Sequence, residues 1–189
     1  MEKPLKQLRG KPLKDFLKTL ERPERELIFL LQDLEYAANV GSAFRIADAC
    51  GVRRMVLTGI TTCPPHPQVR KIACGRDRRV AWTYVEQADE ALVGLKEEGF
   101  TICALELTAS SVPYYAADYP DKLCLVVGHE DHGVTKRTLA ACDMAVFIPM
   151  YGKGASLNAH VSLGVAAYHV LHNRQVGDSR IVPSEEGDL

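Results

Sequence analysis

Two buried strands and the helix between them are encoded by residues 27–58, LIFLLQDLEYAANVGSAFRIADACGVRRMVLT. The short apolar runs at 27–32 and 53–58 predict strands. Residues 39–50 predict a helix between these strands, with Asn39 as a candidate N-cap. The fold is therefore expected to start with a strand–helix–strand unit.

The alternation of strand and helix patterns continues along the rest of the chain. Further strands are predicted at 80–85, 100–106, 122–127 and 145–150, and further helices at 87–98, 135–141 and 157–173, with a Pro-rich loop at 61–68. We expect Ser156 to cap the last helix. One apolar stripe is predicted along that helix, formed by Leu157, Val161, Val165, Tyr168 and Leu171. Strands that alternate with helices predict the α/β class, a mostly parallel sheet with helices on both faces.

The composition is that of an ordinary globular domain. The chain has 189 residues, 47% hydrophobic and 25% charged, which is enough to build one core. No apolar run approaches the roughly 18 residues of a membrane-spanning helix, and the N-terminus lacks the continuous apolar segment of a signal peptide. None of the six cysteines forms a C-x-x-C pair, so we expect free thiols. These features predict a cytoplasmic protein without a membrane span.

Three regions are expected along the chain. Residues 1–26 predict a basic amphipathic extension, because they hold eight basic and five acidic residues as well as several apolar ones. The apolar residues are Leu5, Leu8, Leu13, Phe16, Leu17 and Leu20. Residues 27–174 are expected to form the α/β domain, and residues 175–189 a polar, frayed tail.

Positive charge is concentrated locally, since the net charge of the whole chain is −1. Residues 69–80, VRKIACGRDRRV, hold five basic residues against one acidic residue. The basic residues are Arg70, Lys71, Arg76, Arg78 and Arg79. A charge run is most often a solvated surface, but clusters of this kind also bind phosphate groups. A nucleic acid, if one binds, is expected to contact this segment and the extension.

Three segments rich in glycine and polar residues follow predicted strands. They are 39–45 (NVGSAFR), 128–134 (GHEDHGV) and 148–158 (IPMYGKGASLN). Each has a structural interpretation: Gly41 permits close helix packing, while Gly128 and Gly133 turn the chain. Ligands of open α/β sheets, however, bind outside the carboxyl ends of the strands. The three segments together therefore favour a binding site at one edge of the sheet.

Several common kinds of site are disfavoured. The sequence has neither G-x-G-x-x-G after a strand nor G-x-x-x-x-G-K-[ST], so a dinucleotide-binding dehydrogenase or a P-loop NTPase is not expected. His129 and His132 could suggest a metal-dependent hydrolase that also uses Glu130. No third metal ligand is evident beside this histidine pair, and we expect no metal site.

In this order and spacing, the three segments resemble the signature motifs of the SpoU/TrmH branch of the SPOUT methyltransferases. The first motif, N-x-G-x-x-x-R, matches Asn39, Gly41 and Arg45. The second motif, G-x-E-x-x-G, matches Gly128, Glu130 and Gly133. The third motif, I-P-M-x-G followed by S-L-N, matches Ile148, Pro149, Met150, Gly152, Ser156, Leu157 and Asn158. The resemblance extends over residues 27–173, most of the chain.

The chain departs from these motifs at two places. Ala159-His160-Val161 stands where family members usually have a Val-Ser-Val-like run after S-L-N. His129 stands where a small polar residue is common. Both positions flank the signature residues without replacing them, so the resemblance still implies an active enzyme.

The resemblance implies a fold detail and a cofactor. The family's sheet ends in a deep C-terminal trefoil knot, a rare exception to unknotted chains. The cofactor, S-adenosyl-L-methionine, is held in that knot largely by backbone groups. The matching positions are Leu105, Gly128, Ile148, Ser156 and Leu157. Gly128 has no Cβ, and we expect this to let the cofactor approach the backbone closely.

The implied reaction is transfer of a methyl group to a ribose 2'-hydroxyl of RNA. Arg45 is the residue that the family assigns to this hydroxyl. Because an arginine remains protonated, we expect it to bind phosphate and stabilise alkoxide charge rather than act as a base. Asn39, Glu130 and Asn158 are expected to position Arg45 and the substrate. Ser156 is expected to serve both the helix cap and the catalytic site. The resemblance also implies a homodimer in which Arg45 lies near the cofactor of the partner subunit.

The target RNA is less defined. Since no added RNA-binding domain precedes the catalytic one, the resemblance favours tRNA, with rRNA as the alternative. A non-catalytic RNA-binding dimer on the same scaffold is a further alternative, although all the polar signature residues are present. A base methyltransferase of another SPOUT branch is disfavoured, because N-x-G-x-x-x-R with S-L-N is typical of ribose methylation.

Overall fold

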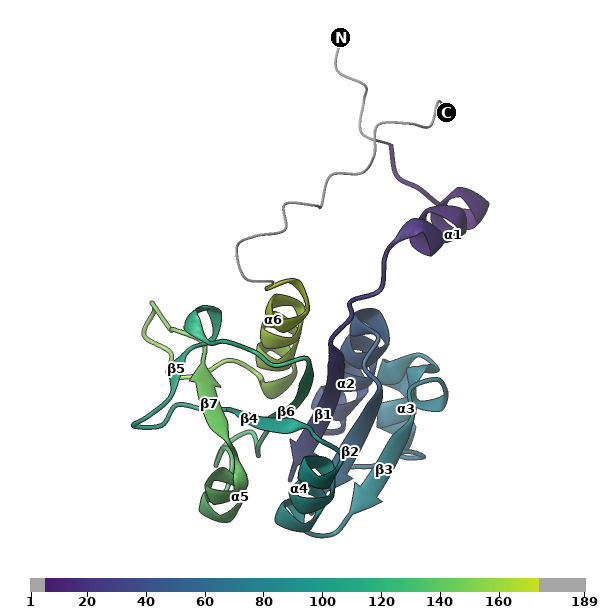
Figure 1. The fold of residues 1–189 in the computed structure, drawn as a ribbon. Helices are drawn as coiled ribbons and strands as arrows, with labels where there is room; N and C mark the ends of the chain where they lie inside the picture. The colour runs from purple at the N-terminus through teal and green to yellow at the C-terminus, as the bar shows by residue number, and fades with distance from the viewer. Residues whose placement is uncertain (1–5, 174–189) are drawn as a thin grey trace.

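The computed structural model describes residues 6–173. Within these residues, seven strands form one sheet in the order β3-β2-β1-β6-β4-β7-β5, and every neighbouring pair is parallel (Figure 1). The strands are β1 (Glu26–Gln32), β2 (Arg54–Thr58), β3 (Trp82–Val85), β4 (Thr101–Leu105), β5 (Val112–Pro113), β6 (Lys122–Val127) and β7 (Met144–Phe147). The predicted parallel sheet is confirmed.

Both faces of the sheet are covered by helices. On one face lie α2 (Ala37–Cys50) and α6 (Ala159–His172), with α3 (Pro67–Ala73) packed against α2. The other face carries α4 (Ala88–Glu97) and α5 (Lys136–Ala141) (Figure 1). This arrangement confirms the predicted two-sided α/β architecture. The trefoil knot that the family resemblance implies stays a prediction.

The side chains of β1 explain why two layers of helices are needed. Successive residues of a strand point to opposite faces, and β1 is buried along almost its whole length. Phe29 and Leu31 belong to the core under α2 and α6, whereas Ile28 and Leu30 belong to the core under α4. A strand that is apolar on both sides is stable only at the centre of a sheet covered on both faces.

The strand order brings the candidate site residues to one edge. β6 lies between β1 and β4, and β7 lies beside β4. Because these strands are parallel, their carboxyl ends meet at the same edge of the sheet. The segments that follow β1, β4, β6 and β7 are therefore neighbours in space.

Two predicted helix starts are wrong. α2 begins at Ala37 with Tyr36 as its N-cap, so Asn39 lies inside the first turn. α6 begins at Ala159 with Asn158 as its N-cap, so Ser156 does not cap it. In both cases the N-cap side chain makes no capping hydrogen bond, and a local capping motif could therefore not locate the start.

Some short elements were absent from the prediction. α3 lies partly in the predicted Pro-rich loop, and Pro67 is its first residue, a position where the missing N–H of proline has no consequence. A 3-10 turn, η1 (Arg76–Arg78), follows α3. Another, η2 (Tyr114–Ala116), follows the two-residue edge strand β5.

Most of the apolar stripe predicted on α6 is exposed, and only Leu171 of it lies in the core. The exposed fractions are 39% for Val161, 36% for Val165 and 48% for Tyr168. The helix contacts the core through Leu171 and through four residues outside the stripe: Leu163, Ala166, Ala167 and Val170. The helix is apolar on two sides, and periodicity alone could not tell which side faces the domain's own core.

The N-terminal helix α1 (Gly10–Thr19) stands apart from the domain in Figure 1 and has no buried residue. The chain rejoins the domain at Arg25, whose guanidinium donates hydrogen bonds to the carbonyls of Val170 and Asn173. The predicted polar tail, 175–189, lies outside the described residues. No helix among residues 6–173 has the length and apolar character needed to cross a membrane. All six cysteines are free thiols, as expected.

Candidate active site

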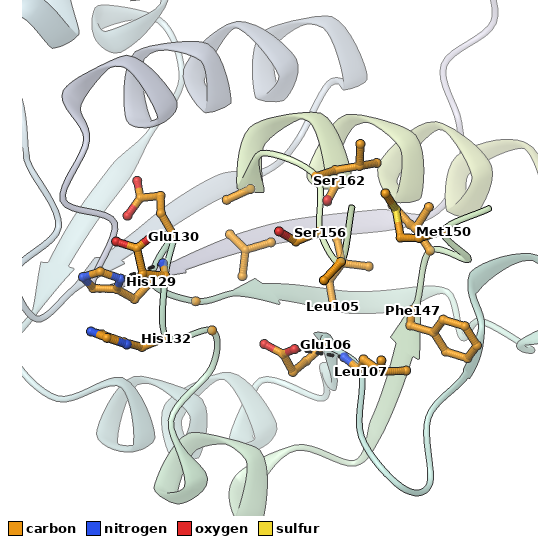
Figure 2. Close-up of a pocket in the computed structure, with 18 residues that line it drawn as sticks. Leu105, Glu106, Leu107, His129, Glu130, His132, Phe147, Met150, Ser156 and Ser162 are labelled. Carbon is orange, nitrogen blue, oxygen red and sulfur yellow. Dashed lines mark hydrogen bonds between the residues drawn. The ribbon is translucent and has the colours of Figure 1, made fainter. Parts of the chain in front are cut away.

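A cavity of about 330 Å³ opens at the carboxyl ends of β4, β6 and β7. All five residues predicted to hold the cofactor line it: Leu105, Gly128, Ile148, Ser156 and Leu157. Figure 2 shows Ser156 and Leu105 in its middle, with Glu130 on one side and Met150 on the other. The topology therefore brings together residues from Leu105 to Ser162, which come from separate segments of the chain.

The loop after β6 forms one wall of this cavity. His129 and Gly133 exchange two backbone hydrogen bonds, of 3.1 and 2.8 Å, which close the loop into a tight turn. A Cβ atom on Gly128 would lie only 2.2 Å from the carbonyl carbon and oxygen of Gly133. Glycine was expected at position 128 because the cofactor approaches the backbone there. The structure gives a different reason: residues 133–134 of the loop itself occupy the space that a side chain would need.

Glu106 joins two walls of the cavity, and no motif pointed to it. Its carboxylate accepts hydrogen bonds from the backbone N–H of Val134 at 3.0 Å and of Leu107 at 3.0 Å. It thereby ties the segment after β4 to the loop after β6. Figure 2 shows Glu106 beside Leu107 among the residues that line the cavity. Its place at the carboxyl end of the strand predicted at 100–106 was the available signal, since strand ends build the sites of parallel sheets.

Glu130 holds the start of α2. Its carboxylate accepts hydrogen bonds from the backbone N–H groups of Glu35 and Tyr36, each at 3.2 Å, and from Asn39 Nδ2 at 2.7 Å. A carboxylate beside a helix N-terminus is favoured by the helix dipole. The first and second motifs are therefore joined directly, and the positioning role expected of Asn39 and Glu130 toward Arg45 stays a prediction.

His160 extends this contact to α6. Its Nδ1 lies 2.8 Å from Asn39 Oδ1, and partial burial lowers the pKa of the imidazole. The sequence marked His160 only as a departure from the family pattern. Its partner lies 121 residues away, so local sequence could not reveal the contact.

The structure does not bring all predicted catalytic residues together. Ser156 and Glu130 line the cavity, but Asn39, Asn158 and Arg45 do not. Asn158 is exposed, and its carbonyl accepts the backbone N–H of Val161 and Ser162 at the start of α6. Arg45 is exposed on α2 and has no hydrogen bond or ion pair to any of residues 6–173.

The basic segment lies beside α2. Asp48 of α2 accepts a hydrogen bond from Arg79 at 3.0 Å and lies 3.5 Å from Arg76 Nε. The first motif makes this packing possible, because Gly41 faces α3: a Cβ there would lie 2.8 Å from Ile72 Cβ. The structural interpretation of Gly41 is confirmed.

The histidine pair of the loop after β6 lines the cavity. The rings of His129 and His132 are 4.7 Å apart, and His129 Nε2 lies 3.8 Å from a carboxylate oxygen of Glu35. Residues 6–173 contain no group of three or more His, Cys, Asp or Glu side chains arranged to hold a metal ion. The metal-dependent hydrolase thus has no observation in its favour.

Known proteins resemble this chain over most of its length. A 23S rRNA (guanosine-2'-O-)-methyltransferase RlmB from Neisseria meningitidis serogroup B is 30% identical over 169 residues, covering 89% of this chain and 66% of that protein. A tRNA (guanosine(18)-2'-O)-methyltransferase from Aquifex aeolicus is 29% identical, covering 87% and 78%. The crystal structure of the A. aeolicus TrmH/SpoU tRNA modifying enzyme superposes with a TM-score of 0.72 at 29% identity, covering 85% and 81%.

The match also covers a defined share of these relatives and of a family model. The chain spans about two thirds of the length of the 23S rRNA methyltransferases that it matches. The model of the SpoU rRNA methylase family matches residues 26–168, which include all three motifs and the cavity. The chain therefore belongs to the SpoU rRNA methylase family.

Proposed function

We propose that this protein transfers a methyl group from S-adenosyl-L-methionine to a ribose 2'-hydroxyl of RNA. The observation that carries the proposal is the convergence of the five expected cofactor residues on one cavity. The two curated relatives named above, both guanosine 2'-O-methyltransferases, support it. A cytoplasmic location is part of the proposal, supported by the six free thiols.

The cavity suits the cofactor in size and chemistry. Its volume of about 330 Å³ lies within the range of small-molecule sites, roughly 300–1,000 Å³. Leu105, Ile148 and Leu157 offer apolar surface to a purine ring, and the Ser156 hydroxyl offers a hydrogen bond. When bound, S-adenosyl-L-methionine supplies an electrophilic methyl group. The protein's part is to hold the ribose hydroxyl in line with that group.

Arg45 is the residue that we assign to the reacting hydroxyl. Its guanidinium is exposed and unpaired among residues 6–173, so it is available to an anion. A guanidinium remains protonated and does not act as a general base. We assign it to the neighbouring phosphate and to the negative charge that develops on the 2'-oxygen. Asn39 and Glu130 position the helix that carries it.

A homodimer would bring Arg45 to a cavity. Arg45 does not line the cavity of its own chain, and α6 presents apolar side chains to solvent at Val161, Val165 and Tyr168. An exposed apolar stripe of this kind marks an interaction surface. A two-fold axis would bury the stripe against its copy in a second subunit. We therefore propose that each active site combines the cavity of one subunit with Arg45 of the other.

The basic segment is the proposed contact for RNA phosphates. Asp48 lies one helical turn after Arg45, so the arginines that it pairs with are held beside Arg45. Lys71 and Arg78 form no ion pair within residues 6–173, which leaves their charge available. Together with Arg70, Arg76 and Arg79, they give this side of α2 a surface suited to phosphate.

We propose tRNA as the target, with 23S rRNA as the alternative. The A. aeolicus tRNA modifying enzyme supports tRNA, and the N. meningitidis relative supports 23S rRNA. Nucleoside mass spectrometry of separated tRNA and rRNA from a deletion strain would identify the RNA by the 2'-O-methylnucleoside that disappears. Loss of a base-methylated nucleoside instead would contradict ribose methylation.

Arg45→Ala tests the catalytic assignment. We expect kcat to fall by about 100-fold or more, because a preorganised group that stabilises transition-state charge is lost. Binding of S-adenosyl-L-methionine, measured by calorimetry, should be unchanged, since the five residues expected to hold the cofactor are intact in this variant. Arg137→Ala on α5 is the matched control, because that exposed arginine lies on the opposite side of the sheet. Normal turnover by Arg45→Ala would exclude the assigned role.

Mixed dimers test whether the site is shared. Arg45→Ala and Leu105→Trp, whose indole would fill the cavity, should each be inactive alone. If the site is shared, a heterodimer of the two variants has one site with both residues intact. Random pairing makes about half of the dimers mixed, each with one working site of two, so about a quarter of wild-type activity should be restored. No recovery in coexpressed mixed dimers would place both residues in the site of a single subunit.

A further inference from the structure

His160 belongs to a chain of hydrogen bonds that joins three separate segments. Its Nδ1 lies 2.8 Å from Asn39 Oδ1 on α2, and Asn39 Nδ2 lies 2.7 Å from Glu130 Oε1 in the loop after β6. Asn39 is 8% exposed, so its amide has little access to water. Among residues 6–173, His160 is the only side chain hydrogen-bonded to Asn39 Oδ1.

The donors and acceptors of this chain can be assigned by elimination. The Glu130 carboxylate also accepts two backbone N–H groups and has no hydrogen to donate. Asn39 must therefore turn its NH₂ group toward Glu130 and its carbonyl oxygen toward His160. A carbonyl oxygen only accepts, so the proton of the 2.8 Å bond belongs to Nδ1 of His160. Burial lowers the pKa of His160, which favours the neutral ring with Nε2 unprotonated.

We propose that His160 is a positioning residue that fixes the orientation of the Asn39 amide. If His160 did not hold Asn39 Oδ1, the amide could turn over and place its oxygen against the Glu130 carboxylate, two acceptors without a proton between them. Glu130 also holds the backbone at the start of α2, the helix that carries Arg45. His160 thus contributes to the placement of Arg45, and this inference rests on the proposed methyl transfer.

Three substitutions distinguish the role of Nδ1 of His160 from that of Nε2. His160→Asn places an amide N–H near the position of Nδ1, whereas His160→Gln places one near Nε2, and His160→Ala removes both. We expect His160→Ala and His160→Gln to lower kcat by about tenfold, the order of one hydrogen bond. His160→Asn should restore most of the activity. KM for S-adenosyl-L-methionine should be unchanged in all three variants, because His160 does not line the cavity.

His169→Ala is the matched control. His169 lies on the same helix and is also half-buried, but it contacts Tyr114 and Tyr119 instead of Asn39. Removing it should affect stability without lowering kcat. The assay measures transfer of labelled methyl groups to total RNA from a deletion strain. Full activity of His160→Ala, or rescue by glutamine but not asparagine, would overturn the proposal.

A second measurement does not depend on turnover. Imidazole nitrogen chemical shifts in an isotope-labelled sample distinguish the two neutral tautomers, and His160 should carry its proton on Nδ1. A proton on Nε2 would refute the hydrogen-bond assignment even in an active enzyme. If the wild-type protein methylates no RNA, the proposed function fails, while the tautomer still decides whether His160 fixes the Asn39 amide.

Discussion

Gly128→Ala tests whether the wall of the cavity depends on a missing side chain. The new Cβ would lie 2.2 Å from the Gly133 carbonyl and 2.3 Å from Val134 N, so the backbone of residues 133–134 would have to move. That movement would break the two bonds between His129 and Gly133 and the bond from Val134 N to Glu106. At roughly 1 kcal/mol for each bond, we expect the free energy of unfolding to fall by about 3 kcal/mol.

The assay is thermal unfolding at fixed protein concentration, because the Tm of the proposed dimer would depend on concentration. For a chain of this size, 1 kcal/mol corresponds to about 3 °C, so Tm should fall by about 9 °C. Gly94→Ala in α4 is the control, because a Cβ at that position would meet no atom within 4 Å and alanine favours a helix. A variant at position 128 as stable as the one at position 94 would refute the packing argument.

Two further substitutions test other parts of the structure. Gly41→Ala would place a Cβ 3.0 Å from the Val69 carbonyl as well as against Ile72, so we expect overpacking to lower the free energy of unfolding by about 1–3 kcal/mol. Gly164→Ala meets only Ile46 at 3.5 Å and should be tolerated; equal denaturant midpoints for the two variants would contradict this reasoning. At Asp143, partial burial raises the carboxyl pKa, but hydrogen bonds from Lys96 and from the backbone of Ile102 outweigh it, and the pKa lies below 3.8. The ionised carboxylate therefore stabilises the fold above that pH and stops doing so as the pH falls through the lowered value. The Tm difference between wild type and Asp143→Asn should be largest at neutral pH and vanish in strong acid.

The sheet and its motifs were predictable because their signals are local. Apolar runs such as 122–127 are too short for helices, and the structure has a strand at those residues. The order of the strands, by contrast, brings β6 between β1 and β4 and could not be derived from periodicity. The cavity could be anticipated only because carboxyl ends of parallel strands share one edge, and because the motif resemblance named the residues that line it.

The missed features depend on partners far away in the sequence. The start of α2 was misplaced because the group that receives its N–H bonds is Glu130, more than 90 residues later, and not a local cap. Glu106 and His160 were missed for the same reason, since each contacts a partner that only folding brings near: Val134 for Glu106 and Asn39 for His160. The sequence predicted the stripe of α6 but not whether it faces the core or a partner, because both surfaces have the same apolar pattern.

The contacts divide the signature residues into two kinds. Gly41, Gly128, Asn39 and Glu130 are engaged with the protein itself, so their presence indicates the architecture more directly than the reaction. Arg45 has no such engagement within residues 6–173, and an unpaired, exposed arginine on a helix fixed this firmly gains nothing for stability. A non-catalytic RNA-binding dimer would need the first group and would use Arg45 for phosphate, but it would have no use for a cavity that suits the cofactor. The case for catalysis therefore rests on Arg45 together with the cavity, and the mixed-dimer experiment tests both at once.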